Sequence, residues 1–236
     1  MPHDMEKPRD PEDLYRALGN DVNPARPILT GDVIEAVEIT NPDGTTITRT
    51  VMVLDHPCSL RTNGVDLADR LHVAEVRDSS PISWREGGFN RMPLPAPMPG
   101  AEGKSRPLAA YFDTSYHISP AQLLAGKRIA CLSVLGIDLM LQRRVKHFSR
   151  VTVPTDDFDK ANIHVYEEAD LLEEWCMERE DHGVKAEDAF SESLKWLRED
   201  LGGRTRQDML KDAGLRSTVR QQMGQRLREL RAASYS

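Results

Sequence analysis

The amino-acid sequence predicts an α+β protein, in which a small, barrel-like β domain closed by one helix precedes a mainly helical C-terminal region. From about Gly31 onward, apolar and polar residues alternate, which is typical of half-buried strands. In the last third of the chain, apolar residues recur at helical spacing. The 236 residues suffice for one compact core and a smaller appendage. We therefore expect a leader over residues 1–30, a barrel domain over 31–152 and a helical region over 153–236.

The leader is rich in Pro, Asp and Arg. A short helix is predicted at Pro11–Leu18, because Asp10 suits the N-cap, Pro11 the first helical position and Gly19 the residue after the end. We expect this leader to pack loosely, if at all.

Strands are predicted where β-branched and apolar residues alternate. Val33–Ile39 and Thr45–Leu54 flank the turn residues Asn41-Pro42-Asp43-Gly44 and should form a hairpin. Two further strands are expected at Leu71–Val76 and Pro107–Phe112. The segment Ile129–Leu132 is either a last strand or a bridge into the helix that follows it. The stretch Arg85–Arg106 holds many Gly, Pro and Met residues and should be a long irregular loop.

Helices are predicted from apolar residues spaced by three or four. A short turn is expected near Ala121–Leu124, and the helix Leu135–Phe148 should close the barrel through Ile137, Leu141, Val145 and Phe148, with Arg143, Arg144 and Lys146 outside. Three amphipathic stripes follow. They comprise Leu171, Leu172, Trp175 and Cys176; then Ala186, Phe190, Leu194, Leu197 and Leu201; then Val219, Met223, Leu227 and Leu230.

The net charge of −7 is unevenly distributed. Residues 156–200 carry 16 acidic and five basic side chains, whereas residues 201–236 carry three acidic and eight basic ones. Such opposed blocks form solvated helix faces, or pair with each other or with a partner. No stretch approaches the roughly 18 consecutive apolar residues of a membrane span. Three cysteines far apart form no disulfide framework, so we expect a cytoplasmic protein that does not bind membranes.

The order of these elements resembles the PemK/MazF-like proteins, which are SH3-like barrel toxins that cut RNA. The resemblance begins with Gly31-Asp32-Val33-Ile34, Val51-Met52-Val53-Leu54 and the run His72–Ser79. It continues with Leu108–Asp113 through Ile118 and the helix Leu135–Phe148, and it covers about half of the chain. It implies a small SH3-like β-barrel with a closing helix.

The departures from the family bear on function. Where the ribonucleases have a basic residue, this chain aligns Tyr111, with Asp113 as its acidic partner. An arginine can stabilise the charge that develops on a phosphate, whereas a tyrosine keeps one donor and no charge. The resemblance therefore implies a non-catalytic or degenerate binding module of a bacterial toxin–antitoxin or phage-defence system. Its partner would be a protein subunit, RNA or DNA, and a homodimer is left open.

A second hypothesis is a metal-independent endoribonuclease with a rearranged site. RNA cleavage needs a base for the 2′-hydroxyl, an acid for the leaving oxygen and a cation for the phosphate. The candidates are Arg77, Asp78, Asp113 and His117. Asp78 and Asp113 are also ordinary turn residues, so the alternative reading is local hydrogen bonding.

A third hypothesis is DNA binding by the C-terminal helices. The run Ala213-Gly214-Leu215 followed by Ser217-Thr218-Val219 loosely resembles a helix-turn-helix, with Ser217 as N-cap. Phosphate contacts would come from Arg204, Arg206, Arg216 and Arg220. The simpler interpretation is a helical hairpin with a solvated basic face.

A last constellation is His56 and Cys58, which could serve as metal ligands or as a nucleophile pair. A structural zinc needs about four ligands, and His72, His117 and Cys131 could join only through the tertiary fold. We expect no metal and no cofactor, with Cys58 buried and His56 ordering its loop. The chain has no phosphate loop, dinucleotide fingerprint or serine-hydrolase motif.

Overall fold

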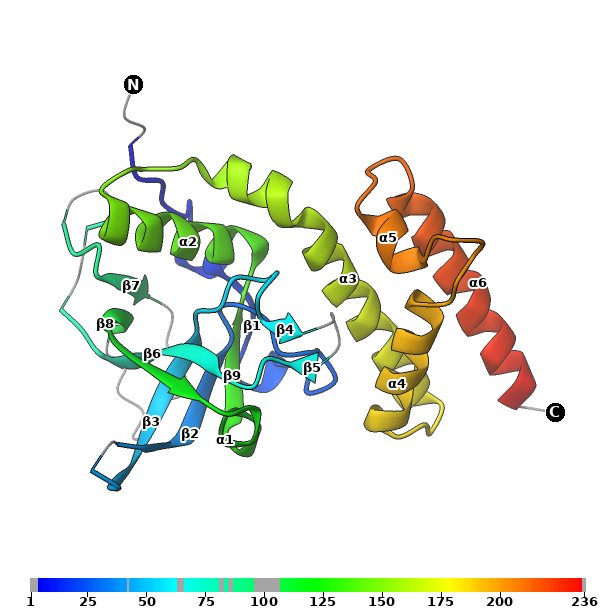
Figure 1. Cartoon of the computed structure of the whole chain (residues 1–236), viewed down its shortest axis with the longest axis horizontal. Coiled ribbons are helices and arrows are strands. Elements are labelled where there is room, and N and C mark those ends of the chain that lie inside the picture. Colours follow the sequence, from blue (N-terminus) through cyan, green and yellow to red (C-terminus); the bar gives the residue numbers. More distant parts are fainter. Residues whose placement is uncertain are drawn as a thin grey trace. The chain divides into compact units, whose positions relative to one another are not determined.

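A computed structural model describes residues 4–41, 43–62, 66–80, 83–84, 87–95 and 107–234. The fold is mixed α+β, as predicted, and it divides into two compact units (Figure 1). The sheet unit comprises Met1–Asn23 and Ile28–Ala161, and the helical unit comprises Pro24–Pro27 and Asn162–Ser236. Among the described residues, no helix combines the length and apolar character that crossing a membrane requires.

The sheet unit is built on a seven-stranded sheet in the order β1-β9-β2-β3-β6-β8-β7. All neighbouring strands run antiparallel. Its strands are β1 (Tyr15–Leu18), β2 (Val33–Thr40), β3 (Thr46–Val53), β6 (Leu71–Asp78), β7 (Arg91–Leu94), β8 (Leu108–Ile118) and β9 (Lys127–Leu132). The short strands β4 (Arg61–Thr62) and β5 (Asp66–Leu67) pair separately. In the described part of the chain, β1 and β7 remain edge strands, so the ladder does not close into the expected barrel.

The predicted hairpin is confirmed as β2 and β3, which pair from Thr40 and Thr46 beside the turn to Val33 and Met52 at the far end. The turn forms because the Asp43 carboxylate accepts hydrogen bonds from both the backbone N–H and the hydroxyl of Thr45. Gly44 supplies the positive φ of +84° that a side chain would disfavour.

The leader departs from the prediction. Pro11–Leu14 forms a 3-10 turn (η1), and Tyr15–Leu18 then joins the sheet by pairing with β9. Leu14 has no exposed surface, and its carbonyl accepts from Ser133 N at 2.8 Å. The expectations of a helix over Pro11–Leu18 and of loose packing were therefore wrong. Pairing with a strand more than 100 residues away outweighs the local helix signal. The sequence pattern does not reveal this distant partner.

The stretch Arg85–Arg106 lies partly outside the described residues, but it is not wholly irregular. Its residues Arg91–Leu94 form the edge strand β7. Met92 and Leu94 have no exposed surface, because β7 lies along β8 and packs near α2. Pro93 fits there because an edge strand has one side without ladder hydrogen bonds.

The predicted closing helix is confirmed as α2 (Val134–Ser149), which lies across the sheet in Figure 1. Ser133 caps it by accepting from Gly136 N, and Arg150 ends it in the left-handed conformation. Two predicted orientations are wrong. Phe148 is 67% exposed, whereas Arg143, expected outside, has no exposed surface. The short helix α1 (Pro120–Ala125) begins with a Ser119 capping box.

The helical unit contains the predicted amphipathic segments. The helix α3 (Thr155–Asp181) enters it at Asn162 and is followed by α4 (Ala186–Leu197), α5 (Arg206–Leu210) and α6 (Arg216–Ser234). Its buried side chains include most of the predicted stripes. They are Leu171, Leu172, Trp175, Cys176, Leu194, Leu197, Val219, Met223 and Leu227. Leu201 lies beyond α4 and is 43% exposed, so it does not belong to the stripe.

Candidate functional sites

One group of titratable side chains gathers where β3 ends and β6 begins. We call this group, formed by Asp55, His56, His72, His117 and Arg144, the histidine cluster. His72 and His117 are register partners whose rings stack at 4.9 Å with an interplanar angle of 9°. Arg144, on α2, has its NH2 group 3.5 Å from His72 Nδ1, and its NH1 group donates to the carbonyl of Leu54. Asp55 Oδ2 accepts from the backbone N–H of His72 at 2.7 Å.

Burial sets the protonation of this cluster. It lowers the pKa of His72 to about 4, and the charges of Arg144 and His117 act in the same direction. Burial and Arg144 also lower the pKa of His56. Burial raises the pKa of Asp55, against the hydrogen bond from His72 and the charge of Arg144. Both His56 and His72 are therefore neutral rings at physiological pH.

A second group surrounds Tyr111 on β8. We call Arg77, Ser79, Ser80, Arg91 and Tyr111 the Tyr111 surface. The guanidinium of Arg77 lies 4.2 Å from the centre of the Tyr111 ring. The NH1 group of Arg91 donates to the Tyr111 hydroxyl at 3.0 Å, and its NH2 group approaches Ser80 Oγ at 3.4 Å. Two cations thus converge on one phenol.

The electrostatics of this surface favour negative charge. Burial opposes ionisation of Tyr111, but hydrogen bonding to Ser79 and Arg91 and the charge of Arg91 outweigh it and lower the pKa of Tyr111. Among the described residues, Arg91 forms no ion pair with a carboxylate, and its buried Nε has no hydrogen-bond partner. Arg77 lies 3.7 Å from Glu75, which also pairs with Arg49 at 3.2 Å. Among the described residues, the NH groups of Arg91 thus contact only the hydroxyls of Tyr111 and Ser80, and no carboxylate neutralises its charge.

A bulge in β8 shapes this surface. Glu75 pairs with Tyr111 and the preceding Ala74 pairs with Ser115, so three extra residues of β8 stand opposite one step of β6. Such bulges redirect side chains. Asp113, at the centre of the bulge, is exposed and accepts a hydrogen bond from the Asn90 amide at 2.8 Å.

The residues of the ribonuclease hypothesis do not share one place. His117 pairs with His72 at the start of β6, whereas Arg77 and Asp78 stand at its end. Arg77 follows His72 by five residue steps along the strand, which is about 16 Å. Sequence reasoning also missed Arg91 and Arg144. Arg91 lies in a segment that was expected to be a loop, and Arg144 lies on a helix face that was expected to be exposed. In each case the sequence signal was no more than an arginine beside apolar residues.

The four C-terminal arginines all have partners within the helical unit. Arg220 pairs with Glu167 at 2.8 Å and with Glu174 at 3.7 Å. Arg216 Nε donates to the carbonyl of Leu210 at 2.9 Å. Arg204 lies 3.8 Å from Asp212. The acidic and basic blocks thus pair partly with each other, as one of the alternatives read from the sequence proposed.

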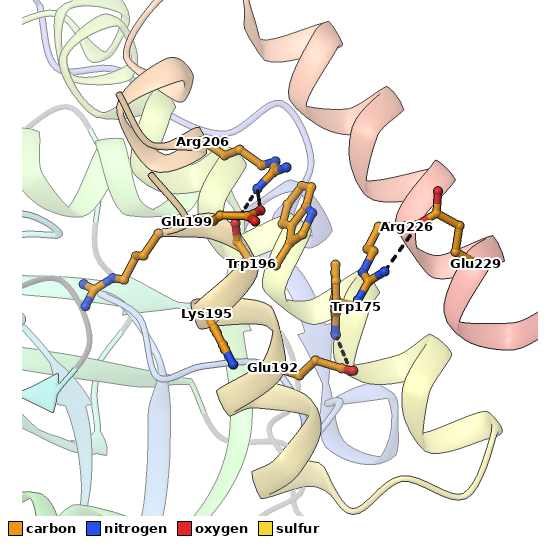
Figure 2. A pocket seen from close by; sticks show the side chains of 9 residues that line it. Trp175, Glu192, Lys195, Trp196, Glu199, Arg206, Arg226 and Glu229 are labelled. Atoms are coloured by element: carbon orange, nitrogen blue, oxygen red, sulfur yellow. Dashed lines mark hydrogen bonds and ion pairs between the residues drawn. The ribbon is translucent and has the colours of Figure 1, made fainter. Parts of the chain in front are cut away.

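Arg206 lines a pocket of about 780 Å³ in the helical unit (Figure 2). Its NH1 group donates to the Trp196 carbonyl at 2.8 Å and to Glu199 at 2.7 Å, and the guanidinium lies 4.6 Å from the centre of the Trp196 ring. Trp175 donates to Glu192 across the pocket at 3.2 Å. Trp175 and Trp196 are only 1% and 8% exposed, so they belong to the buried core at the wall of the pocket.

No grouping of three or more metal-ligating side chains occurs in the parts of the chain that the structure covers. Cys58, expected to be buried, is exposed, and its backbone N–H donates to His56 Nδ1 at 3.2 Å. That contact orders the loop as predicted for His56. Compared with known proteins, the chain matches no family model and no curated protein.

Proposed function

We propose that the sheet unit is a degenerate PemK/MazF-like module, related to the SH3-like barrel toxins, that binds single-stranded RNA at the Tyr111 surface. The biological setting would be a bacterial toxin–antitoxin or phage-defence system. The observation that carries the proposal is the pair of guanidinium groups converging on the half-buried phenol of Tyr111, with Arg91 in no ion pair with a carboxylate in the described part of the chain.

The Tyr111 surface suits RNA because it offers both cations for the phosphates and planar groups for the bases. A guanidinium donates charge-assisted hydrogen bonds to phosphate oxygens, and arginine and tyrosine planes stack on unpaired bases. Arg91 and Arg77 supply the charge, and Tyr111 supplies a planar ring together with a hydroxyl. The dispersal of the ribonuclease candidates along β6 supports binding without cleavage.

The test is the affinity of the full chain for a fluorescent single-stranded RNA, measured by anisotropy at several salt concentrations. Arg91→Ala should weaken binding about tenfold or more, because hydrogen bonds to charged groups contribute about 1.5–3 kcal/mol. It should also reduce the log–log salt slope by about 0.7, the share of one phosphate contact. Lys127→Ala removes an equally positive, exposed side chain of the same unit and should change little. Equal effects of the two substitutions would refute the site.

A second candidate is a metal-independent endoribonuclease, which the lowered pKa of Tyr111 favours because an ionised phenol can accept the 2′-hydroxyl proton. The same RNA is incubated with the protein and a chelator and then resolved on a gel. Cleavage that Tyr111→Phe abolishes would establish this candidate. If the RNA stays bound but intact, the endoribonuclease candidate is refuted and the binding module is retained.

A further inference from the structure

A second arginine–tyrosine pair lies on the same face of the sheet as the Tyr111 surface. Arg49, on β3, forms a hydrogen bond with the hydroxyl of Tyr116 on β8, as Arg91 does with the hydroxyl of Tyr111. Arg49 is 41% exposed, and Tyr116 is half-buried. The sheet thus presents the same combination of a guanidinium and a phenol twice.

The bulge in β8 brings the two tyrosines to one face. In a regular strand, Tyr111 and Tyr116 would point to opposite faces, because five residue steps separate them. The three extra residues of the bulge shift the register, so that Tyr111 pairs with Glu75 and Tyr116 pairs with Val73. Because Glu75 and Val73 are two steps apart on β6, the two tyrosines share a face at a spacing of about 7 Å along the strand.

Glu75 lies between the two pairs and connects them. Its largely buried carboxylate has Oε1 at 3.2 Å from Arg49 Nε and Oε2 at 3.7 Å from Arg77 NH1. The Tyr116 hydroxyl donates to the same Oε2 at 3.4 Å. Burial raises the pKa of Tyr116, and the charge of Glu75 acts in the same direction against that of Arg49, so this phenol keeps its proton.

This face carries more positive than negative charge. Its arginines are Arg49, Arg77 and Arg91, on β3, β6 and β7. In the described part of the chain, Glu75 is the carboxylate that forms ion pairs with them. Asp78 directly follows Arg77 and so points to the opposite face. A positive excess remains even when Asp113, exposed on the bulge, is counted.

We propose that the RNA site continues along β8 from Tyr111 to Tyr116, and that Arg49 and Tyr116 hold a second nucleotide beside the one at Arg91 and Tyr111. Each pair offers a cation for a phosphate and a planar ring for an unpaired base. The inference rests on the proposed RNA binding and specifies its ligand as a chain of at least two nucleotides.

The experiment measures how well uridine monophosphate and a four-nucleotide oligouridylate displace a fluorescent RNA from the full chain. The oligonucleotide should bind about tenfold or more tightly than the mononucleotide, because only the oligonucleotide reaches both pairs at once. Arg49→Ala should weaken oligonucleotide binding about tenfold and reduce its log–log salt slope by about 0.7, the share of one phosphate contact. The affinity for the mononucleotide should stay nearly unchanged, since the pair of Arg91 and Tyr111 is intact. Arg70→Ala removes an exposed arginine just before β6, at the end of the strand remote from Arg77, and should change neither affinity.

Two substitutions of Tyr116 test the ring. Tyr116→Ala should weaken the oligonucleotide about tenfold, the loss expected for one stacked base, whereas Tyr116→Phe keeps the ring and should retain most of the affinity. Phe148→Ala removes an exposed ring on α2 and should have no effect. Circular dichroism shows whether each variant is folded. Equal losses in Tyr116→Phe and Tyr116→Ala would contradict stacking on this ring.

The outcomes separate this inference from the proposal on which it rests. If Arg49→Ala and Tyr116→Ala leave the oligonucleotide affinity unchanged while Arg91→Ala weakens it, the second nucleotide position does not exist and the Tyr111 surface stands. If Arg91→Ala has no effect either, the RNA surface itself is refuted. Equal weakening by Arg49→Ala and Arg70→Ala would point to general electrostatic attraction and would overturn the second position.

Discussion

Arg143 is a buried cation that forms no ion pair with a carboxylate among the described residues, and replacing it with methionine tests what it contributes. The side chain has no exposed surface. It donates to the carbonyls of Arg91, Trp84 and Gly88 at 2.9, 3.0 and 3.1 Å. Its guanidinium also lies 5.3 Å from the centre of the Trp84 ring. Burial lowers the pKa of Arg143 to about 10, with the charge of Arg91 acting in the same direction, but the group stays protonated.

The magnitude follows from two opposing terms. Three hydrogen bonds to a charged donor contribute about 5–9 kcal/mol, at about 1.5–3 kcal/mol each. Desolvating the guanidinium costs several kcal/mol, which methionine would recover. We therefore expect Arg143→Met to lower the free energy of unfolding by about 3 kcal/mol. For a chain of this size that is a fall of roughly 6–12 °C in Tm.

The assay is urea unfolding followed by tryptophan fluorescence and circular dichroism, with Lys127→Met as the exposed control. Arg143→Lys should retain part of the stability, since an ammonium group keeps the charge but lacks the planar fork that reaches several carbonyls. Arg143→Met should also weaken RNA binding, because Arg143 holds the backbone of Arg91. A variant within about 0.5 kcal/mol of the parent would refute the reasoning, because that is the range of ordinary surface substitutions.

Three further predictions concern other parts of the chain. The pKa of His72 falls to about 4 on folding, so the unfolded chain binds the proton first as the pH drops. The free energy of unfolding should therefore decrease between about pH 6.5 and 4, by about 1–2 kcal/mol after allowance for solvent screening. His72→Gln should remove this decrease, measured as the pH dependence of the urea midpoint. Gly136→Ala should destabilise despite its better helix propensity, because a Cβ would lie 2.3 Å from the Leu14 carbonyl; a raised Tm would contradict this. Glu167→Gln should lower stability by about 0.5 kcal/mol at low salt and not at about 1 M, since its partner Arg220 is 41% exposed; a loss that persists in salt would show that the pair is not screened.

The sequence predicted those elements whose signal is local. Alternation located the β2–β3 hairpin and β6, and the three-and-four spacing located α2 and the stripes of the helical unit. It could not locate β1 or β7, because each is a short segment that becomes a strand only through pairing with a distant partner. The closed barrel was expected from the family resemblance, and the described sheet keeps two edges instead.

The candidate sites were harder to predict than the fold. Tyr111 was singled out, but the cation beside it, Arg91, lay in a stretch read as a loop. Arg143 was placed outside, although a spacing of four and three from Gly136 through Met140 puts it on the buried face. His117 and Arg77 were grouped by residue type, and only the register of β6 and β8 shows that they stand at opposite ends. Chemistry-bearing residues carry no periodic signal, so tertiary pairing decides which of them meet.

The strand order determines when the sheet can be completed during synthesis on the ribosome. β9 lies between β1 and β2, yet it is synthesised roughly 110 residues after β1. At about 5–20 residues per second, the ribosome needs about 5–20 s to bridge that interval. Until Leu132 emerges, the nascent sheet ends at an uncovered β2, and Tyr15–Leu18 has no ladder to join. The strand β1 leaves the ribosome before the other strands of the sheet and is thus among the last of them to be fixed. A chaperone or a neighbouring nascent chain has those seconds in which to bind the open edge.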